Sequence, residues 1–152
     1  MNNENLELNV LKWDMRWLEM AKLVSTWSKD PSTKVGAVIA DHKQQISIGY
    51  NGFPQKIQDD ERLHIREVKY KIIRHAEDNA IKHKSRPDLQ GCTIYTFPFM
   101  PCSRCAGRII DEDITRVVSF KSSHSRWEKE FEFSRQLFYE AGVELIEYEY
   151  ES

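Results

Sequence analysis

The sequence has few cysteines, no long apolar run and almost no net charge. Its 152 residues include three cysteines, an odd number, and two of these form a C-x-x-C pair. This usage argues against a disulfide framework and favours an intracellular metal or redox site. No apolar run approaches the length of about 20 residues that a membrane-spanning helix requires. The formal net charge of −2 gives no sign of a surface for nucleic acid.

The remaining bulk properties are those of an ordinary globular protein. Hydrophobic residues make up 40% of the chain and charged residues 30%, and no repeat or low-complexity segment interrupts it. We therefore expect a single domain over residues 1–152, with a sizeable core. The polar and acidic segment 1–5 does not resemble a secretory signal, so we expect the protein in the cytoplasm.

Hydrophobic periodicity predicts alternating helices and strands. An apolar stripe predicts an amphipathic helix over 12–27, and the segment 65–84 is expected to be helical with a break near His75. A short helix is expected over 102–111, and a further helix over 127–141 ends at Gly142. The expected strands are 35–40, 45–50, 92–97, 115–120 and 143–148, with a long loop over 51–64. This order indicates an α/β fold in which helices sandwich a mixed sheet.

Two short motifs carry the chemistry. His75-Ala76-Glu77 and Pro101-Cys102-Ser103-Arg104-Cys105 together form the H-x-E…P-C-x-x-C pattern, which is typical of zinc-dependent nucleobase deaminases. Cysteines three residues apart on a helix share a face, and a proline suits the start of that helix. A histidine and two cysteines provide three ligands, and catalytic zinc sites keep the fourth position for water.

The spacing of His75 and Glu77 constrains the geometry further. Residues two positions apart do not share a face of a regular helix, so the two side chains can converge only if the metal lies beyond the helix tip. Cys92 lies in an apolar strand and is expected in the core. A C-x-x-C pair alone is also compatible with a structural zinc site or a redox site.

The chain as a whole resembles the deoxycytidylate (dCMP) deaminase family of the cytidine deaminase-like superfamily. The resemblance covers about residues 12–148. It rests first on both motifs, the first of which extends to Ile81. It rests also on the segments 28–34 and 35–40, on the segment 49–54, which reads G-Y-N-G-F-P, and on Lys69-Tyr70. It implies a three-layer αβα sandwich around a five-stranded mixed sheet of order 2-1-3-4-5. Arg74 departs from the pattern, because an apolar residue or cysteine is more usual there.

The resemblance also implies an activity and roles for residues. His75, Cys102 and Cys105 would bind one Zn²⁺ per chain, and Glu77 would move protons during the hydrolytic deamination of dCMP to dUMP and ammonia, which supplies dTMP synthesis. Asn51 would contact the sugar, and Ala76 would offer its backbone N–H to the base. A homo-oligomer (hexamer or dimer) is expected, with possible regulation by dCTP and dTTP with Mg²⁺.

A nucleotide phosphate needs cations or several donors. One candidate loop before the first strand contains Lys29, Ser32, Thr33 and Lys34. A second follows the fourth strand and contains Lys121, Ser122 and Ser123, at the end where ligands gather in open sheets. Arg104 is a further candidate, and all of these could equally be solvated loop residues.

Three alternatives remain open. The chain could deaminate another cytosine nucleoside or nucleotide or a base in RNA, although the acidic balance disfavours RNA. It could be a non-catalytic zinc module that holds a partner, in which case a fourth protein ligand would complete the zinc site. It could be a C-x-x-C redox protein.

Overall fold

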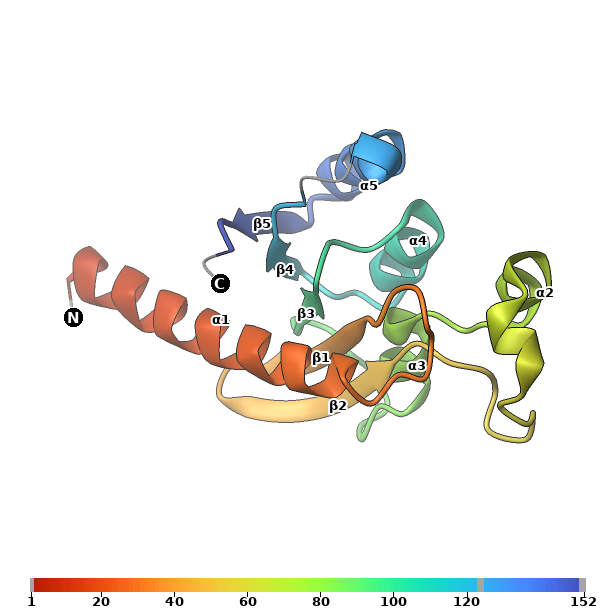
Figure 1. The fold of residues 1–152 in the computed structure, drawn as a ribbon. Coiled ribbons are helices and arrows are strands. Elements are labelled where there is room, and N and C mark those ends of the chain that lie inside the picture. The colour runs from red at the N-terminus through yellow and green to blue at the C-terminus, as the bar shows by residue number, and fades with distance from the viewer. Residues whose placement is uncertain (1, 123–124, 151–152) are drawn as a thin grey trace.

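A five-stranded mixed sheet forms the centre of the protein, as the computed structural model shows for residues 2–122 and 125–150 (Figure 1). The strands are β1 Gly36–Asp41, β2 Gln44–Tyr50, β3 Thr93–Phe97, β4 Arg116–Phe120 and β5 Glu144–Tyr148. Their order is β2-β1-β3-β4-β5, which confirms the expected order. β1 is antiparallel to both β2 and β3, whereas β3, β4 and β5 are parallel.

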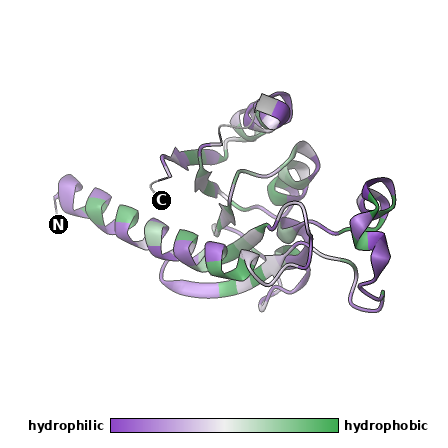
Figure 2. Ribbon diagram, viewed as in Figure 1, coloured by the Kyte–Doolittle hydropathy of each residue, from purple (hydrophilic) through white to green (hydrophobic). Residues whose placement is uncertain are grey.

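Helices cover both faces of this sheet, because successive residues of a strand point to opposite sides. Val38 and Ala40 pack against α1 (Asn3–Ser25), whereas Ala37 and Ile39 face the second layer. The second layer consists of α3 Ala76–Lys82, α4 Ser103–Asp111 and α5 Glu128–Ala141. The expected three-layer sandwich is therefore confirmed, and Figure 2 shows hydrophobic residues along the strands and recurring along α1.

The first helix is longer than its apolar stripe predicts. It begins at Asn3 and ends at Ser25, not at 12 and 27, and the Asn2 side chain caps it by accepting a hydrogen bond from the Asn5 N–H. Residues 3–12 are exposed and project beyond the sheet (Figure 1). The stripe located only the half of the helix that packs on the sheet. The other half contains four apolar residues that stay exposed: Leu6, Leu8, Val10 and Leu11. Trp27 lies after the helix and is half-exposed.

A buried carboxylate fixes α1 to the sheet. Asp14 is only 1% exposed and accepts two hydrogen bonds from the Arg116 guanidinium, at 2.9 and 2.7 Å. It also accepts hydrogen bonds from the hydroxyls of Tyr95 and Tyr148. This charge has donors around it, which a buried carboxylate requires.

The segment after β2 forms an insert, residues 53–73, that leaves the sheet and returns to it. Its base is closed by two backbone hydrogen bonds between Gly52 and Arg74, at 3.1 and 2.8 Å. The insert contains a 3₁₀ helix η1, Glu61–His64, where a loop was expected, and the short helix α2, Arg66–Ile72. The expected break near His75 is confirmed, because the chain is non-helical between α2 and α3.

The remaining elements agree with the sequence pattern. A second 3₁₀ helix, η2 Ser125–Trp127, precedes α5, and α5 ends at Gly142 in the left-handed conformation (φ 73°). Gly49 of β2 lies directly against α3, where a Cβ would collide with backbone atoms of Ala76 and Ala80. Among the described residues, no helix has both the length and the apolar character needed to cross a membrane.

Candidate metal centre and substrate cavity

Three side chains from two helix starts converge into a candidate metal site. His75 and Cys102 are the residues immediately before α3 and α4, and both have extended backbone. Cys105 follows in the first turn of α4. The His75 Nδ1 atom lies 3.5 Å from the Cys102 Sγ and 3.4 Å from the Cys105 Sγ. All three ligand atoms lie within 4.8 Å of one another.

These separations fit a zinc ion. Zinc binds histidine nitrogen at about 2.0–2.1 Å and cysteine sulfur at about 2.3 Å, and in a tetrahedron those bonds separate N from S by about 3.5 Å. In the part of the chain that the structure describes, this is the one group of three or more His, Cys, Asp or Glu residues close enough to share a metal. Three protein ligands, with no fourth from the described residues, correspond to a catalytic site and not to a closed structural one.

The protonation of the cluster is suited to metal binding. The pKa of Cys102 is lowered to about 4, because Cys105 and His75 both hydrogen-bond to its sulfur. The hydrogen bond to Cys102 raises the pKa of His75 to about 9, and the same sulfur raises the pKa of Cys105. The lowered pKa of Cys102 favours its thiolate, which is the form that binds a metal. Binding of a metal would release the protons that the raised pKa values favour on His75 and Cys105.

Glu77 is buried beside this cluster, at 4% exposure. Because His75 stands in extended backbone ahead of α3, the two side chains can converge without a shared helical face, as the spacing required. Burial raises the pKa of Glu77 to about 7. A carboxyl group that titrates near neutral pH can both accept and donate a proton, which is the requirement for a general acid–base group.

The start of α4 is held in place by α5. The Glu130 carboxylate accepts hydrogen bonds from the N–H of Ser103 (2.9 Å) and from its hydroxyl (2.6 Å). The Ser134 hydroxyl donates to the Pro101 carbonyl at 2.9 Å. These contacts fix the residues on both sides of Cys102. Glu130 was missed in the sequence because a charged residue on a helix carries no signal of such a role.

A cavity of about 900 Å³ opens onto this cluster. Of the residues predicted from the sequence, those lining it are Ser32, Thr33, Lys34, Asn51, His75, Ala76, Glu77 and Cys102. The insert, η2 and the start of α5 complete its wall with side chains that the sequence did not single out for substrate binding, including His64, Arg66, Lys69, Arg126, Trp127 and Glu130. Lys34 uses its ammonium group to donate to the Ser28 carbonyl.

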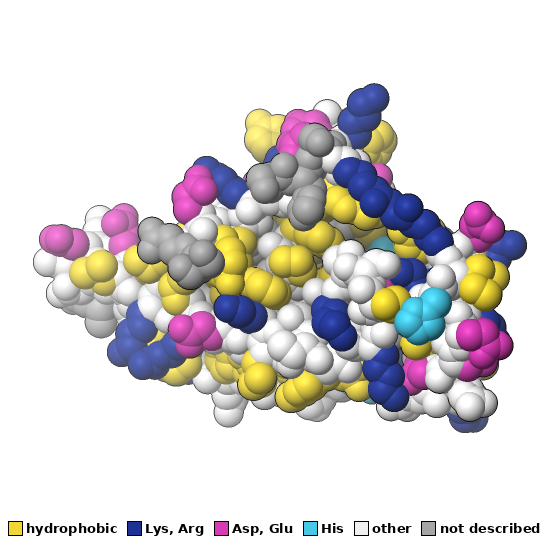
Figure 3. Space-filling model, in the orientation of Figure 1, with side chains coloured by type: hydrophobic (Ala, Val, Ile, Leu, Met, Phe, Trp, Pro, Cys, Tyr) yellow, Lys and Arg dark blue, Asp and Glu magenta, His cyan; other side chains and the backbone are white. Residues whose placement is uncertain are grey.

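Several predicted phosphate-binding residues do not line this cavity. Lys29 is exposed and pairs with Asp59 at 3.1 Å, and Arg104 is exposed on α4. Lys121 pairs with Glu149 at 2.9 Å, and its neighbour Ser122 is likewise absent from the lining. Ser123 lies outside the described residues. On the face shown in Figure 3, basic and acidic side chains are interspersed.

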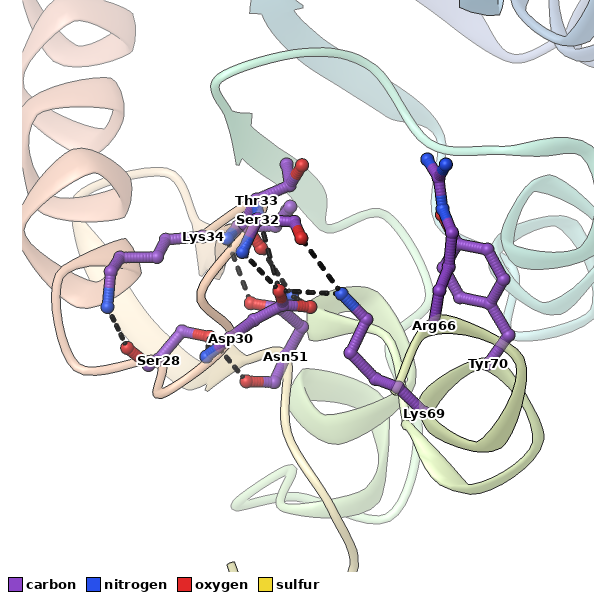
Figure 4. A network of polar contacts seen from close by, with 10 residues as sticks. Ser28, Asp30, Ser32, Thr33, Lys34, Asn51, Arg66, Lys69 and Tyr70 are labelled. Atoms are coloured by element: carbon purple, nitrogen blue, oxygen red, sulfur yellow. Dashed lines mark hydrogen bonds and ion pairs between the residues drawn. The ribbon is translucent and has the colours of Figure 1, made fainter. Parts of the chain in front are cut away.

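Asn51 stands at the end of β2 with its carboxamide held on three sides (Figure 4). Its Oδ1 accepts a hydrogen bond from the Val35 N–H at 2.9 Å. Its amide group donates to the Thr33 carbonyl at 2.8 Å and to Asp30 at 3.4 Å. Because both amide hydrogens have partners within the chain, Asn51 can offer a ligand the second lone pair of Oδ1, which suits a hydroxyl donor.

Comparison with known proteins identifies the family. The model of the cytidine and deoxycytidylate deaminase zinc-binding region matches residues 11–121. A deaminase of Aliivibrio fischeri is 43% identical over 139 residues, which covers 90% of this chain and 93% of the relative. Human deoxycytidylate deaminase is 38% identical over 140 residues, covering 88% and 78%.

A solved structure supports the fold. The dCMP deaminase of cyanophage S-TIM5, in its apo form, superposes with a TM-score of 0.72 over 90% of this chain and 97% of its own, at 20% identity. At that identity the likeness concerns the fold. Together with the matches in sequence, it means that the chain belongs to the deoxycytidylate deaminase family, a family of zinc-dependent deaminases.

Proposed function

We propose that this protein hydrolyses dCMP to dUMP and ammonia with one Zn²⁺ per chain. The observation that carries the proposal is the convergence of His75, Cys102 and Cys105 beside the buried Glu77, next to the cavity that Asn51 also lines. Relatives named deoxycytidylate deaminase, at 38% identity over most of the chain, support this substrate over other cytosine compounds.

Metal binding and proton transfer would be carried out by different residues of the chain. His75, Cys102 and Cys105 would hold the zinc, which when bound supplies a Lewis acid that activates water. Glu77 accepts one proton from the attacking water and delivers it to N3 of the cytosine. It then takes the proton of the hydroxyl group added at C4 and delivers it to the amino group, which leaves as ammonia while the C4 carbonyl forms. With its pKa raised to about 7, Glu77 can perform both halves of this transfer near neutral pH.

The substrate-binding roles follow from the cavity wall. Asn51 accepts a hydrogen bond from a sugar hydroxyl, and Ala76, the first residue of α3, presents an N–H that has no partner within the helix. Ser32 and Thr33 face the same space and are our candidates for the phosphate. Lys29, Lys121 and Ser122 stay candidates only if the cavity changes on binding or a neighbouring subunit brings them close.

The remaining expectations belong to the same proposal. We infer a single domain over residues 1–152, since helices from both ends of the chain pack on one sheet. We also propose a cytoplasmic homo-oligomer, a hexamer or dimer, that supplies dTMP synthesis and binds no nucleic acid or membrane. The family resemblance also implies regulation by dCTP and dTTP with Mg²⁺, which can be tested by adding these nucleotides to the assay of ammonia release from dCMP.

A substrate panel tests the proposal. The zinc-loaded protein is incubated with dCMP, dCTP, deoxycytidine, CMP and a cytosine-containing RNA, and ammonia release is followed. The proposal expects the highest kcat/KM for dCMP. Preference for deoxycytidine or RNA would replace it with another deaminase activity, and no ammonia from any of the five would favour a non-catalytic zinc module.

A further inference from the structure

The insert contributes a buried charge to the cavity wall. Lys69 of α2 is 3% exposed, although lysine is almost never buried without a partner. Its ammonium group lies 3.0 Å from the Asp30 carboxylate, and the two side chains are only 4% and 5% exposed. It also donates to the Ser32 hydroxyl at 3.3 Å. Figure 4 shows Lys69 reaching from the insert towards the loop before β1.

Asp30 connects Lys69 to the backbone of the loop before β1. Its Oδ1 accepts hydrogen bonds from the N–H groups of Ser32 (2.8 Å) and Thr33 (3.3 Å) in addition to the Lys69 ammonium. Its Oδ2 accepts the amide hydrogen of Asn51 at 3.4 Å. One carboxylate thus sets the backbone of the loop and the orientation of the Asn51 carboxamide.

The same residues form one wall of the substrate cavity. Asp30, Ser32, Thr33, Asn51 and Lys69 all line it together with Glu77. Within the described part of the chain, the Lys69 ammonium directs its hydrogen bonds to Asp30 and Ser32, and not to the metal cluster. The hydrogen bonds of Asp30 and Lys69 therefore shape the part of the cavity that would receive the sugar and phosphate. The metal cluster is positioned separately, by the starts of α3 and α4 and by the contacts of α5 with α4.

We propose that Lys69 is a positioning residue, which fixes Asn51 and the Ser32–Thr33 loop for nucleotide binding by neutralising and orienting Asp30. The inference rests on the proposed function. Without Lys69, a buried carboxylate would lack its counter-charge, and the loop would shift to bring water to it. Substrate binding would suffer, whereas the groups that perform the chemistry would keep their places.

The test compares dCMP deamination by the wild type, the single variant Lys69→Met and a double variant. Lys69→Met retains the aliphatic volume and should raise the KM for dCMP at least about tenfold, with kcat changed less than about threefold and zinc still bound. Asp30→Asn, added to Lys69→Met, removes the unpaired charge and keeps an acceptor for the loop N–H groups. The double variant should return KM to within about threefold of the wild-type value.

A matched control separates this effect from the loss of any ion pair. Lys84 forms a partly buried pair with Glu112 at 2.9 Å, and neither residue lines the cavity. Lys84→Met should leave KM and kcat unchanged. If Lys69→Met cannot be purified folded, Lys69→Gln is measured by the same criteria, and calorimetric titration with dUMP should show a matching rise in Kd.

Two results would overturn the inference. An unchanged KM in the single variant would mean that Lys69 does not position the wall. A raised KM that Asp30→Asn does not restore would mean that Lys69 acts other than through Asp30, for example by direct contact with the phosphate. Wild-type protein that releases no ammonia from dCMP would instead refute the proposed function, so the two failures are distinguishable.

Discussion

Glu130 accepts two hydrogen bonds from Ser103, the residue that follows Cys102, and so links α5 to a proposed metal ligand. Groups that orient metal ligands typically change metal affinity or activity by about 10–100-fold when removed. We expect Glu130→Ala to weaken zinc binding by a factor in that range, while Glu130→Gln, which keeps an acceptor oxygen, weakens it less. Competition with a chromogenic chelator measures both. Equal affinity in the wild type and Glu130→Ala would show that Ser103 needs no such support.

Gly49 allows β2 to contact the backbone of α3, the helix that begins directly after His75. Gly49→Ala should destabilise the protein by about 1–3 kcal/mol, the usual cost of overpacking, because the new methyl group meets backbone and not a movable side chain. Urea unfolding measures the loss. Gly107 on α4 has open space where a Cβ would stand, so Gly107→Ala is the matched control and should not destabilise. A similar loss in both variants would contradict the close-approach argument.

Thr33 lines the cavity, whereas Lys121 does not and pairs with Glu149. If the loop before β1 binds the phosphate, Thr33→Val should raise the KM for dCMP severalfold and affect deoxycytidine little, because the lost hydroxyl would serve only the charged substrate. Lys121→Met should affect neither substrate strongly. Steady-state kinetics on both substrates decide between the loops: an increase confined to Lys121→Met would move the phosphate site to the end of β4.

Burial of Glu77 should make the metal-free protein less stable as pH rises. Its pKa is raised from 4.5 to about 7 in the folded state, so between these values the unfolded chain gives up a proton that the folded chain keeps. The folded state therefore loses up to about 3 kcal/mol across that window relative to a variant without the carboxyl group. In zinc-free samples, Glu77→Gln should be more stable than the wild type at pH 8 and nearly equal near pH 4. Urea unfolding at both pH values measures the difference, and a difference that does not vary with pH would exclude this explanation.

The convergence of His75, Cys102 and Cys105 could be predicted from the sequence because the information in the two motifs is local. His75 and Glu77 are two residues apart, Cys102 and Cys105 are three apart, and a proline marks where the second helix begins. The structure places all three proposed ligand atoms within 4.8 Å, as the motifs indicate. The strand order came from the family resemblance, since the hydrophobic pattern alone does not specify how five strands are arranged.

The cavity wall was less predictable, because it depends on contacts between distant segments. Lys69 and Asp30 are 39 positions apart, and an isolated lysine on a short helix is expected in solvent. The Asp30-Pro31-Ser32 sequence did contain a signal, since an aspartate side chain often accepts hydrogen bonds from N–H groups two or three residues later. Lys121 does not line the cavity; the general rule for open sheets gives the end of a strand and not the direction of a side chain.

The central claim is tested most directly by ammonia release from dCMP, measured side by side for zinc-loaded wild-type protein and Glu77→Gln, with the metal content of each determined. We predict one zinc per chain in both proteins, turnover of dCMP by the wild type, and a loss of at least about 10²–10⁴-fold in the variant. Wild-type turnover in Glu77→Gln, or loss of its zinc, would contradict the assignment of Glu77 as the group that moves protons beside the metal.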